Sequence, residues 1–148
     1  MGSSLIEVLV TMVVIALGLL GQAALTAQSG KANNAAFMRS QATLLAYDML
    51  ERIRLQNRTL ALNGGFTNGF ATNGGDPSDN VPSGTAIQNV ELRDWKNNIE
   101  QTLPFGDANV SVDNAGFAII VIRWCEVANK LDCTDSRNLT TFTTMSDI

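Results

Sequence analysis

The feature that most constrains this chain is an apolar stretch close to its N-terminus. From Val8 to Gly30 the sequence carries no charged residue over 23 positions. A helix that crosses a bilayer needs about 20 apolar residues, a length that Leu5 to Leu25 reaches. One acid, Glu7, lies near one end of the segment. The stretch predicts a helix that is surrounded by lipid or by other apolar helices.

The helical pattern continues beyond the apolar stretch, and no proline occurs before Pro77. Apolar residues recur at spacings of three, four or seven, which places them on one face of a helix. This stripe contains Met38, Ala42, Leu45, Met49, Ile53 and Leu60, with Ala46 and Leu50 beside it. We therefore predict one helix from Leu5 to about Arg58, roughly 80 Å long at about 1.5 Å per residue.

A secretory signal peptide is the alternative interpretation of the first 28 residues. Such a peptide has a basic start and a small-residue cleavage site after the apolar run. Met1 to Ser4 contain no base, whereas Ala23-Ala24 and Thr26-Ala27 fit the cleavage pattern. The alternative stays open on local pattern, but the helical stripe beyond the apolar run disfavours it.

Composition excludes several kinds of site. The chain has no histidine, ten basic and fourteen acidic residues, and a net charge of −4. Without histidine, Ser-His and Cys-His catalysis and most zinc sites are ruled out. The sequence contains no run of Lys and Arg with interleaved aromatic residues, and this argues against nucleic-acid binding. We expect no enzyme activity, cofactor, metal or direct nucleic-acid contact.

Two cysteines occur, Cys125 and Cys133, separated by a short polar stretch. An isolated pair of this kind suits a disulfide in an oxidising compartment. Two free thiols in a reduced cytosolic protein are the alternative. Bridged, the pair would close a short loop from Glu126 to Asp132.

The rest of the chain predicts a small α+β fold. Asn63 to Gly84 is rich in Gly, Pro and Asn and indicates a long loop. Leu92, Trp95, Ile99 and Leu103 share one face of a short helix from about Val90 to Leu103, which Pro104 ends. Alternation predicts a strand at Asn109–Asp113, and a turn at Asn114-Ala115-Gly116 joins it to a more buried strand at Phe117–Cys125. The Thr-rich segment Leu139–Met145 predicts a third strand. We expect a long N-terminal helix packed on a small antiparallel sheet.

The N-terminus resembles a known family. Gly2-Ser3-Ser4-Leu5-Ile6-Glu7-Val8-Leu9-Val10 is similar to the processing region of type IV pilins and pseudopilins. Two further stretches, Gly18 to Gly21 and Leu45 to Arg54, resemble the PilV type of minor pilin. The similarity covers Gly2 to about Arg58; beyond that it rests on architecture. It implies the pilin fold, in which a C-terminal disulfide loop often delimits an exposed region.

The resemblance also implies a processing site. A prepilin peptidase would cut after Gly2 and methylate the new N-terminus at Ser3, which makes Glu7 the fifth residue. Residues 1–2 are then residual leader, 3–28 the transmembrane and polymerisation half of the helix, and 29–148 the globular domain with its Gly-rich loop at 63–84. The family usually has Phe or Met after the cut and a longer basic leader, so we expect a start that is mis-set or trimmed.

Glu7 itself indicates an assembly role. A carboxylate in an apolar segment costs at least about 2.5 kcal/mol, so it should have a partner or a function. No base lies within one helical turn of Glu7 in the sequence. The α-amine freed at Ser3 of an adjacent subunit would be a suitable partner, and the pair would set the axial register of packed helices. A carboxylate at the headgroup boundary with no special role is the alternative.

The resemblance implies a structural function, as a minor pilin that helps prime a type IV pilus and sits at or near its tip. Twitching motility, adhesion or DNA uptake would follow from the whole fibre. The expected partners are the major and other minor pilins, the prepilin peptidase, the assembly platform and the bacterial inner membrane, before assembly into a cell-surface pilus. A minor pseudopilin of a type II secretion system is the alternative.

Overall fold

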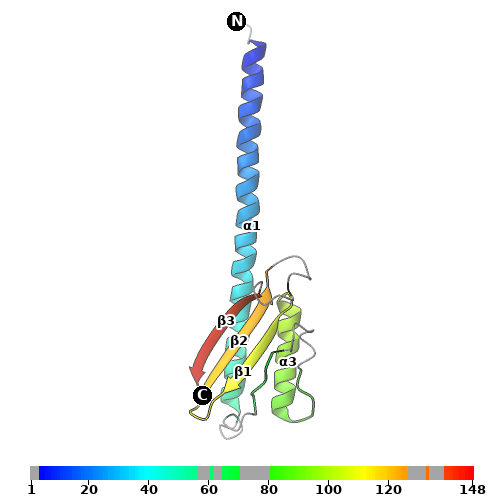
Figure 1. Cartoon of the computed structure of the whole chain (residues 1–148), viewed down its shortest axis with the longest axis vertical. Coiled ribbons are helices and arrows are strands. Elements are labelled where there is room, and N and C mark those ends of the chain that lie inside the picture. The colour runs from blue at the N-terminus through cyan, green and yellow to red at the C-terminus, as the bar shows by residue number, and fades with distance from the viewer. Residues whose placement is uncertain (1–3, 57–60, 62–64, 71–80, 127–132, 134–138) are drawn as a thin grey trace. The chain divides into compact units, whose positions relative to one another are not determined.

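The computed structural model describes residues 4–56, 61, 65–70, 81–126, 133 and 139–148. Its elements are α1 (Leu5–Leu55), α3 (Ile87–Thr102), β1 (Asp107–Val112), β2 (Phe117–Cys125) and β3 (Leu139–Asp147) (Figure 1). This is the predicted α+β fold with a long N-terminal helix. The chain forms two compact units, residues 1–37 and 38–148, which are described separately below.

The described part of the first unit consists of the N-terminal half of α1. Thirteen large apolar side chains between Leu5 and Leu25 are 46–84% exposed, and they lie on all sides of the helix. An α-helix that is apolar all round belongs in a membrane or in a packed bundle. Among the described residues, one helix is long and apolar enough to cross a membrane, and none of its apolar window is buried.

The second unit begins with the C-terminal half of α1, which carries the predicted stripe. Within α1 the buried residues are Ala42, Leu45, Ala46, Met49, Leu50 and Ile53. Met38 is partly buried against the same core, whereas Leu60 lies outside the described residues. The 3.6-residue spacing of these side chains therefore predicted the face that meets the globular core.

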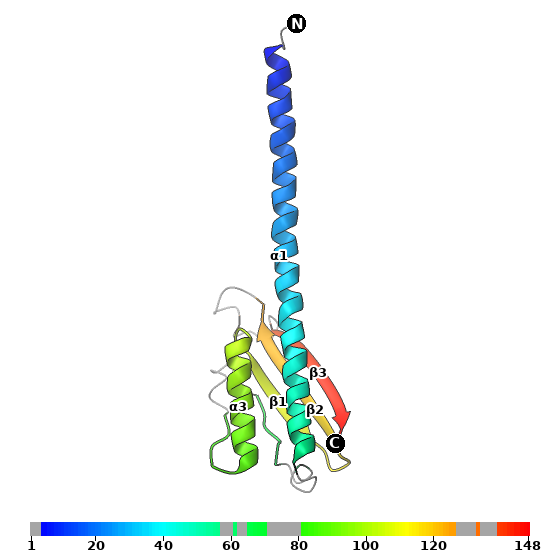
Figure 2. The same ribbon diagram turned by 180° about the vertical axis from the view of Figure 1, so that it is seen from behind.

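Helix α3 packs through the face that the sequence predicted. Leu92, Trp95 and Ile99 are buried, and Leu103 follows them just after the helix. Pro104 is incompatible with a continued helix because it lacks an N–H group, and α3 ends at Thr102. The helix begins at Ile87, three residues before the predicted start. Figure 2 shows α3 and the second half of α1 on the same face of the sheet.

The sheet is antiparallel, with strand order β1-β2-β3. Pairing runs from Asp107↔Arg123 to Val112↔Ala118 between β1 and β2, and from Phe117↔Asp147 to Cys125↔Leu139 between β2 and β3. The even-numbered residues of β2 face the core and are buried. Strand β2 has the predicted bounds, while β1 starts and ends earlier than predicted and β3 extends two residues further.

The β1–β2 turn follows from one aspartate and one glycine. The Asp113 carboxylate accepts hydrogen bonds from the N–H groups of Ala115 at 2.9 Å and Phe117 at 2.8 Å. Gly116 has a φ of +96°, a conformation that suits glycine because it has no Cβ. The predicted turn at Asn114-Ala115-Gly116 is confirmed.

The two tryptophans of the core provide a matched test of this packing. Both are buried, but the indole Nε1 of Trp95 donates to the Leu45 carbonyl at 2.7 Å. The Trp124 Nε1 has no hydrogen-bond partner among the described residues. Because both substitutions remove the same ring volume, Trp95→Phe should destabilise the fold by about 1 kcal/mol more than Trp124→Phe. Urea unfolding followed by circular dichroism measures this difference, and equal midpoints would contradict the hydrogen-bond assignment.

Candidate functional site

Glu7 lies in the first turn of α1. The helix begins at Leu5, and the Ser4 carbonyl accepts hydrogen bonds from the backbone N–H groups of Glu7 at 2.9 Å and Val8 at 3.4 Å. An acidic side chain in a first turn interacts favourably with the helix dipole. The local backbone therefore accommodates a negative charge at this position.

The Glu7 carboxylate forms no ion pair with any cation in the described part of the chain. The first basic residue along the sequence is Lys31, 24 positions further on, which is more than six turns of helix. No basic residue of α1 is therefore within reach of the Glu7 carboxylate. Gly2 and Ser3, the expected processing site, lie outside the described residues.

Gly18 and Gly21 leave space on the surface of this helix. A Cβ atom built at either position would meet no heavy atom within 4 Å, so no contact within the described structure requires glycine there. Each glycine costs about 1 kcal/mol relative to alanine inside a helix. Small residues at such positions allow a second helix to approach closely.

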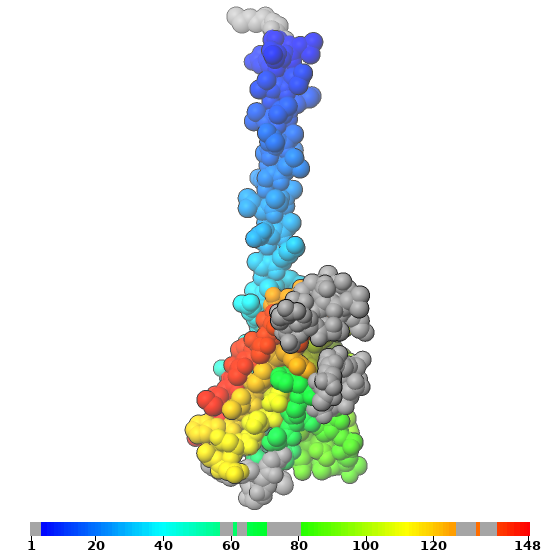
Figure 3. All heavy atoms as spheres, in the orientation of Figure 1, coloured from blue at the N-terminus to red at the C-terminus, as the bar shows by residue number. Residues whose placement is uncertain are grey.

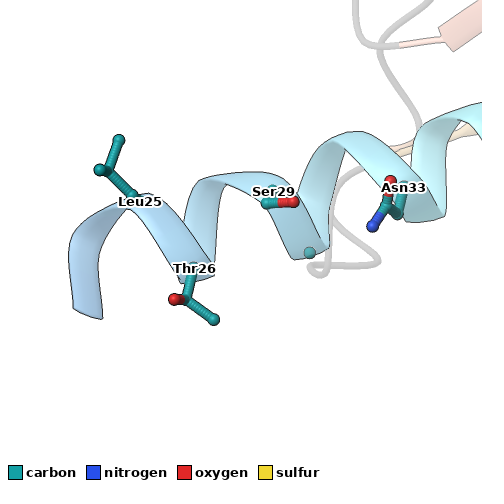
Figure 4. Close-up of a pocket in the computed structure, with 5 residues that line it drawn as sticks. Leu25, Thr26, Ser29 and Asn33 are labelled. Carbon is teal, nitrogen blue, oxygen red and sulfur yellow. The ribbon is translucent and has the colours of Figure 1, made fainter. Parts of the chain in front are cut away.

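A shallow depression lies on the same half of α1, lined by Leu25, Thr26, Ser29, Gly30 and Asn33. Figure 4 shows that the labelled side chains project from a single helix. The Thr26 hydroxyl already donates to the Gln22 carbonyl at 2.9 Å. Since all five lining residues belong to one helix, the depression is an open stretch of helix surface and not an enclosed cavity.

The predicted disulfide is present. Cys125, the last residue of β2, is bonded to Cys133, with their Cα atoms 5.6 Å apart. Both cysteines are buried. The bond ties the chain after β2 back to the sheet shortly before β3 begins at Leu139. Most of the enclosed loop, residues 127–132, lies outside the described residues.

Removing this bond should lower stability by an amount set mainly by loop closure. With a sequence separation of 8, the chain-entropy relation gives about 2.5 kcal/mol. We expect the double variant Cys125→Ser, Cys133→Ser and the reduced wild-type protein to lose similar stability in urea unfolding. An unchanged midpoint in both would show that the bond does not constrain the unfolded chain.

A buried ion cluster, consisting of Lys96, Asp107 and Arg123, joins α3 to the sheet. One Asp107 carboxylate oxygen accepts from Arg123 Nη2 at 2.8 Å, and the other lies 3.6 Å from Lys96 Nζ. The side chains of Lys96 and Asp107 are 3% and 4% exposed. Lys96 Nζ also donates to the Gly69 carbonyl at 2.7 Å, and the Arg123 guanidinium lies 4.0 Å from the centre of the Phe70 ring.

Burying the charged groups of this cluster costs free energy of desolvation. Burial lowers the pKa of Lys96, and the nearby carboxylate of Asp107 partly offsets this change. Partial burial of Arg52 acts to lower its pKa, but the hydrogen bonds that Arg52 donates to the carboxylates of Glu91 and Asp48 outweigh it and raise the pKa. Asp48 and Glu91 thus hold Arg52 between α1 and α3. The contacts of Arg52 and of the Lys96–Asp107–Arg123 cluster thus hold the helices in place. The sequence interpretation missed this cluster because its members are far apart in the chain.

Neither the cluster nor the helix surface provides a metal centre. Within the described residues, no three His, Cys, Asp or Glu side chains are close enough to hold a metal ion. The candidate residues that the structure does describe are those of the exposed apolar half of α1 and Glu7 in its first turn.

Comparison with known proteins finds no matching family model, no matching curated protein and no matching solved structure. The fold and the disulfide nevertheless define a pilin-like architecture, with a long apolar N-terminal helix, a small antiparallel sheet and a C-terminal disulfide.

Proposed function

We propose that this chain is a minor pilin, a structural subunit of a type IV pilus with no active site of its own. The observation that carries the proposal is the division of one continuous helix into two kinds of surface. The first half of α1 exposes apolar side chains on every side, whereas the second half buries one stripe in a globular core. A helix of this kind suits a subunit that is stored in a membrane and then packed into a fibre.

The proposed cycle uses few residues. A prepilin peptidase cuts after Gly2 and methylates Ser3, and the apolar half of α1 holds the subunit in the inner membrane with its globular domain in the periplasm. On extraction, the exposed apolar side chains leave lipid and pack against the helices of other pilins. Gly18 and Gly21 permit close approach there, because no neighbouring side chain fills the space beside them.

Glu7 has the central role in this proposal. A lone carboxylate in lipid costs at least about 2.5 kcal/mol, and pairing with the α-amine of a neighbouring subunit removes that cost. The pairing geometry admits one axial offset between the helices, as a buried polar residue does in a coiled coil. The acid therefore favours entry into the helix bundle and fixes the register.

If the subunit primes assembly at or near the tip, pili should depend on it strongly even though it makes up little of the fibre. Deletion of the gene should remove most surface pili, and with them twitching, adhesion or DNA uptake, although the subunit is a small fraction of the fibre. Expression of the full-length chain in trans should restore the pili.

The same deletion strain distinguishes a pilus subunit from a pseudopilin. If pili persist while secretion of folded proteins into the medium stops, the subunit belongs to a type II secretion system instead. If both pili and secretion are normal, the chain is not an assembly subunit of either machine.

A further inference from the structure

The two edges of the sheet differ in the described structure. At the β1 edge, the backbone of Asn68 exchanges two hydrogen bonds with that of Val110, at 2.9 and 2.8 Å. The β3 edge has no comparable strand or loop partner among the described residues. Figure 3 shows β3, in red, as one margin of the outer face of the sheet.

The pairing register identifies which backbone groups of β3 point outward. In an antiparallel sheet the N–H and C=O of a given residue point to the same neighbour, and successive residues alternate. The N–H and C=O groups of Val110 form hydrogen bonds on the side away from β2. Because the register of both strand pairs is continuous, the N–H and C=O groups of Phe142 and Thr144 must point toward β2. Thr141, Thr143 and Met145 consequently direct their N–H and C=O groups away from the sheet.

This row, which we call the open edge, is defined by Thr141, Thr143 and Met145. It is limited at its C-terminal end by Arg54 of α1, whose Nη2 donates to the Asp147 carbonyl at 3.3 Å and to the Ser146 hydroxyl at 2.6 Å. The bond to the Asp147 carbonyl agrees with this alternation, because Asp147, like Thr141, Thr143 and Met145, directs its backbone groups away from β2. For the three residues of the open edge, the described structure contains no such partner.

The open edge also lacks the devices that usually protect a sheet margin. Natural edge strands are short, or carry Pro, Lys or a bulge. Strand β3 has nine residues, LTTFTTMSD, with no proline and no lysine, and its register against β2 is unbroken. Its only charge is on Asp147, at the end where Arg54 is bound.

We propose that the open edge of β3 is a docking site for an extended strand of a different protein, which adds to the sheet as a fourth strand. An extended strand matches the edge because it alternates donors and acceptors at the same spacing. Since Thr141, Thr143 and Met145 are exposed and uncharged, the partner segment is also uncharged and rich in β-branched residues, which pair well with threonine across strands.

A second copy of this chain is a poorer occupant. Arg54, near the end of α1, meets Ser146 and Asp147, at the end of β3, and Figure 1 shows the second half of α1 and β3 running in the same general direction. Antiparallel pairing of two β3 strands about a two-fold axis would reverse residues 38–55 of α1 in the second copy. Pilus subunits share one orientation, so this choice of occupant rests on the proposed function.

Proline substitution separates docking from folding. Thr143→Pro removes an outward N–H and leaves the hydrogen bonds to β2 intact, and proline is tolerated at such edge positions. Thr143→Val is the matched control, since it keeps the N–H. An intact disulfide and unchanged tryptophan fluorescence verify the fold of each full-length variant, and Thr141→Pro serves as the second variant if Thr143→Pro fails this check.

The measurement is amide hydrogen exchange of the segment 139–148 in the full-length chain, in native membranes and after purification in detergent. Exchange at Thr141, Thr143 and Met145 should be at least about tenfold slower in membranes, while the segment 107–112, whose edge is already bridged, stays unchanged. A photo-crosslinker at Met145, which is 64% exposed, should form an adduct with another polypeptide that persists in Thr143→Val and disappears in Thr143→Pro.

Each other outcome overturns the proposal. Equally fast exchange in membranes and detergent, or an adduct that survives Thr143→Pro, shows that no strand is added at this edge. An adduct of twice the chain's own mass shows self-pairing. The presence of the Thr143→Pro variant in surface pili at wild-type levels, with no protection of β3 in the wild type, would refute docking and leave the proposed function standing.

Discussion

Asp107→Ala should destabilise the fold by about 3–5 kcal/mol, the cost of breaking a buried ion pair from one side. The substitution leaves Lys96, whose side chain is 3% exposed, beside a second cation, Arg123. It also removes the carboxylate acceptor of the Ala108 N–H, which lies 2.7 Å away. Urea unfolding of the full-length chain in detergent micelles, followed by the fluorescence of the buried tryptophans, measures the loss.

Two further variants test whether the loss of stability in Asp107→Ala comes from buried charge. Asp94→Ala removes an exposed acid of α3 that lies 4.0 Å from Arg93, and it should change stability by less than about 0.5 kcal/mol. Adding Lys96→Met to Asp107→Ala should recover part of the loss, because it removes the uncompensated buried cation. If Asp107→Ala costs no more than Asp94→Ala, the cluster does not hold α3 on the sheet.

Glu7→Ala should reduce the amount of this subunit in surface pili by at least about tenfold. The variant lacks the carboxylate that we propose pairs with a neighbouring amine, while its apolar segment still inserts in a bilayer. The 2.5 kcal/mol at stake is close to two powers of ten in an equilibrium constant. Quantitative mass spectrometry of sheared pili measures the change relative to the major subunit.

The level of the subunit in the inner membrane should stay the same in this experiment, which separates assembly from insertion. Thr11→Ala is a suitable control on the same helix, because in the described part of the chain the Thr11 hydroxyl donates to the Val8 carbonyl, one turn away. It should enter pili normally. Normal incorporation of Glu7→Ala would refute the register role and favour the alternative that the acid simply lies at the headgroup boundary.

Periodic patterns predicted much of this fold correctly. The buried stripe of α1 and the core face of α3 follow from apolar residues at a spacing of 3.6, and β2 follows from a continuous apolar run after a turn. The turn before β2 and the end of α3 follow from Gly116 and Pro104. These features depend on residues close together in the chain, where local stereochemistry limits the possible conformations.

Other features depend on contacts that no local pattern contains. The sequence predicted that the first strand begins at Asn109, but β1 begins at Asp107, whose buried carboxylate is compensated by Lys96 and Arg123. Similarly, Arg54 lies on α1 yet bonds to Ser146 at the end of β3, a separation of 92 residues. The candidate site shows the same division: local pattern in the sequence singles out Glu7, whereas the neighbour that we propose for it would be contributed by another chain and leaves no pattern in this one.

The most direct test of the central claim is to find what Glu7 contacts in the assembled fibre. A zero-length carbodiimide crosslinker joins a carboxylate to an amine in contact with it, and mass spectrometry of digested pili identifies the linked peptides. We predict a link between Glu7 and the N-terminal amine of a neighbouring subunit, absent in Glu7→Gln. Pili that contain this chain and yield other carboxylate–amine links, but none at Glu7, would contradict the account.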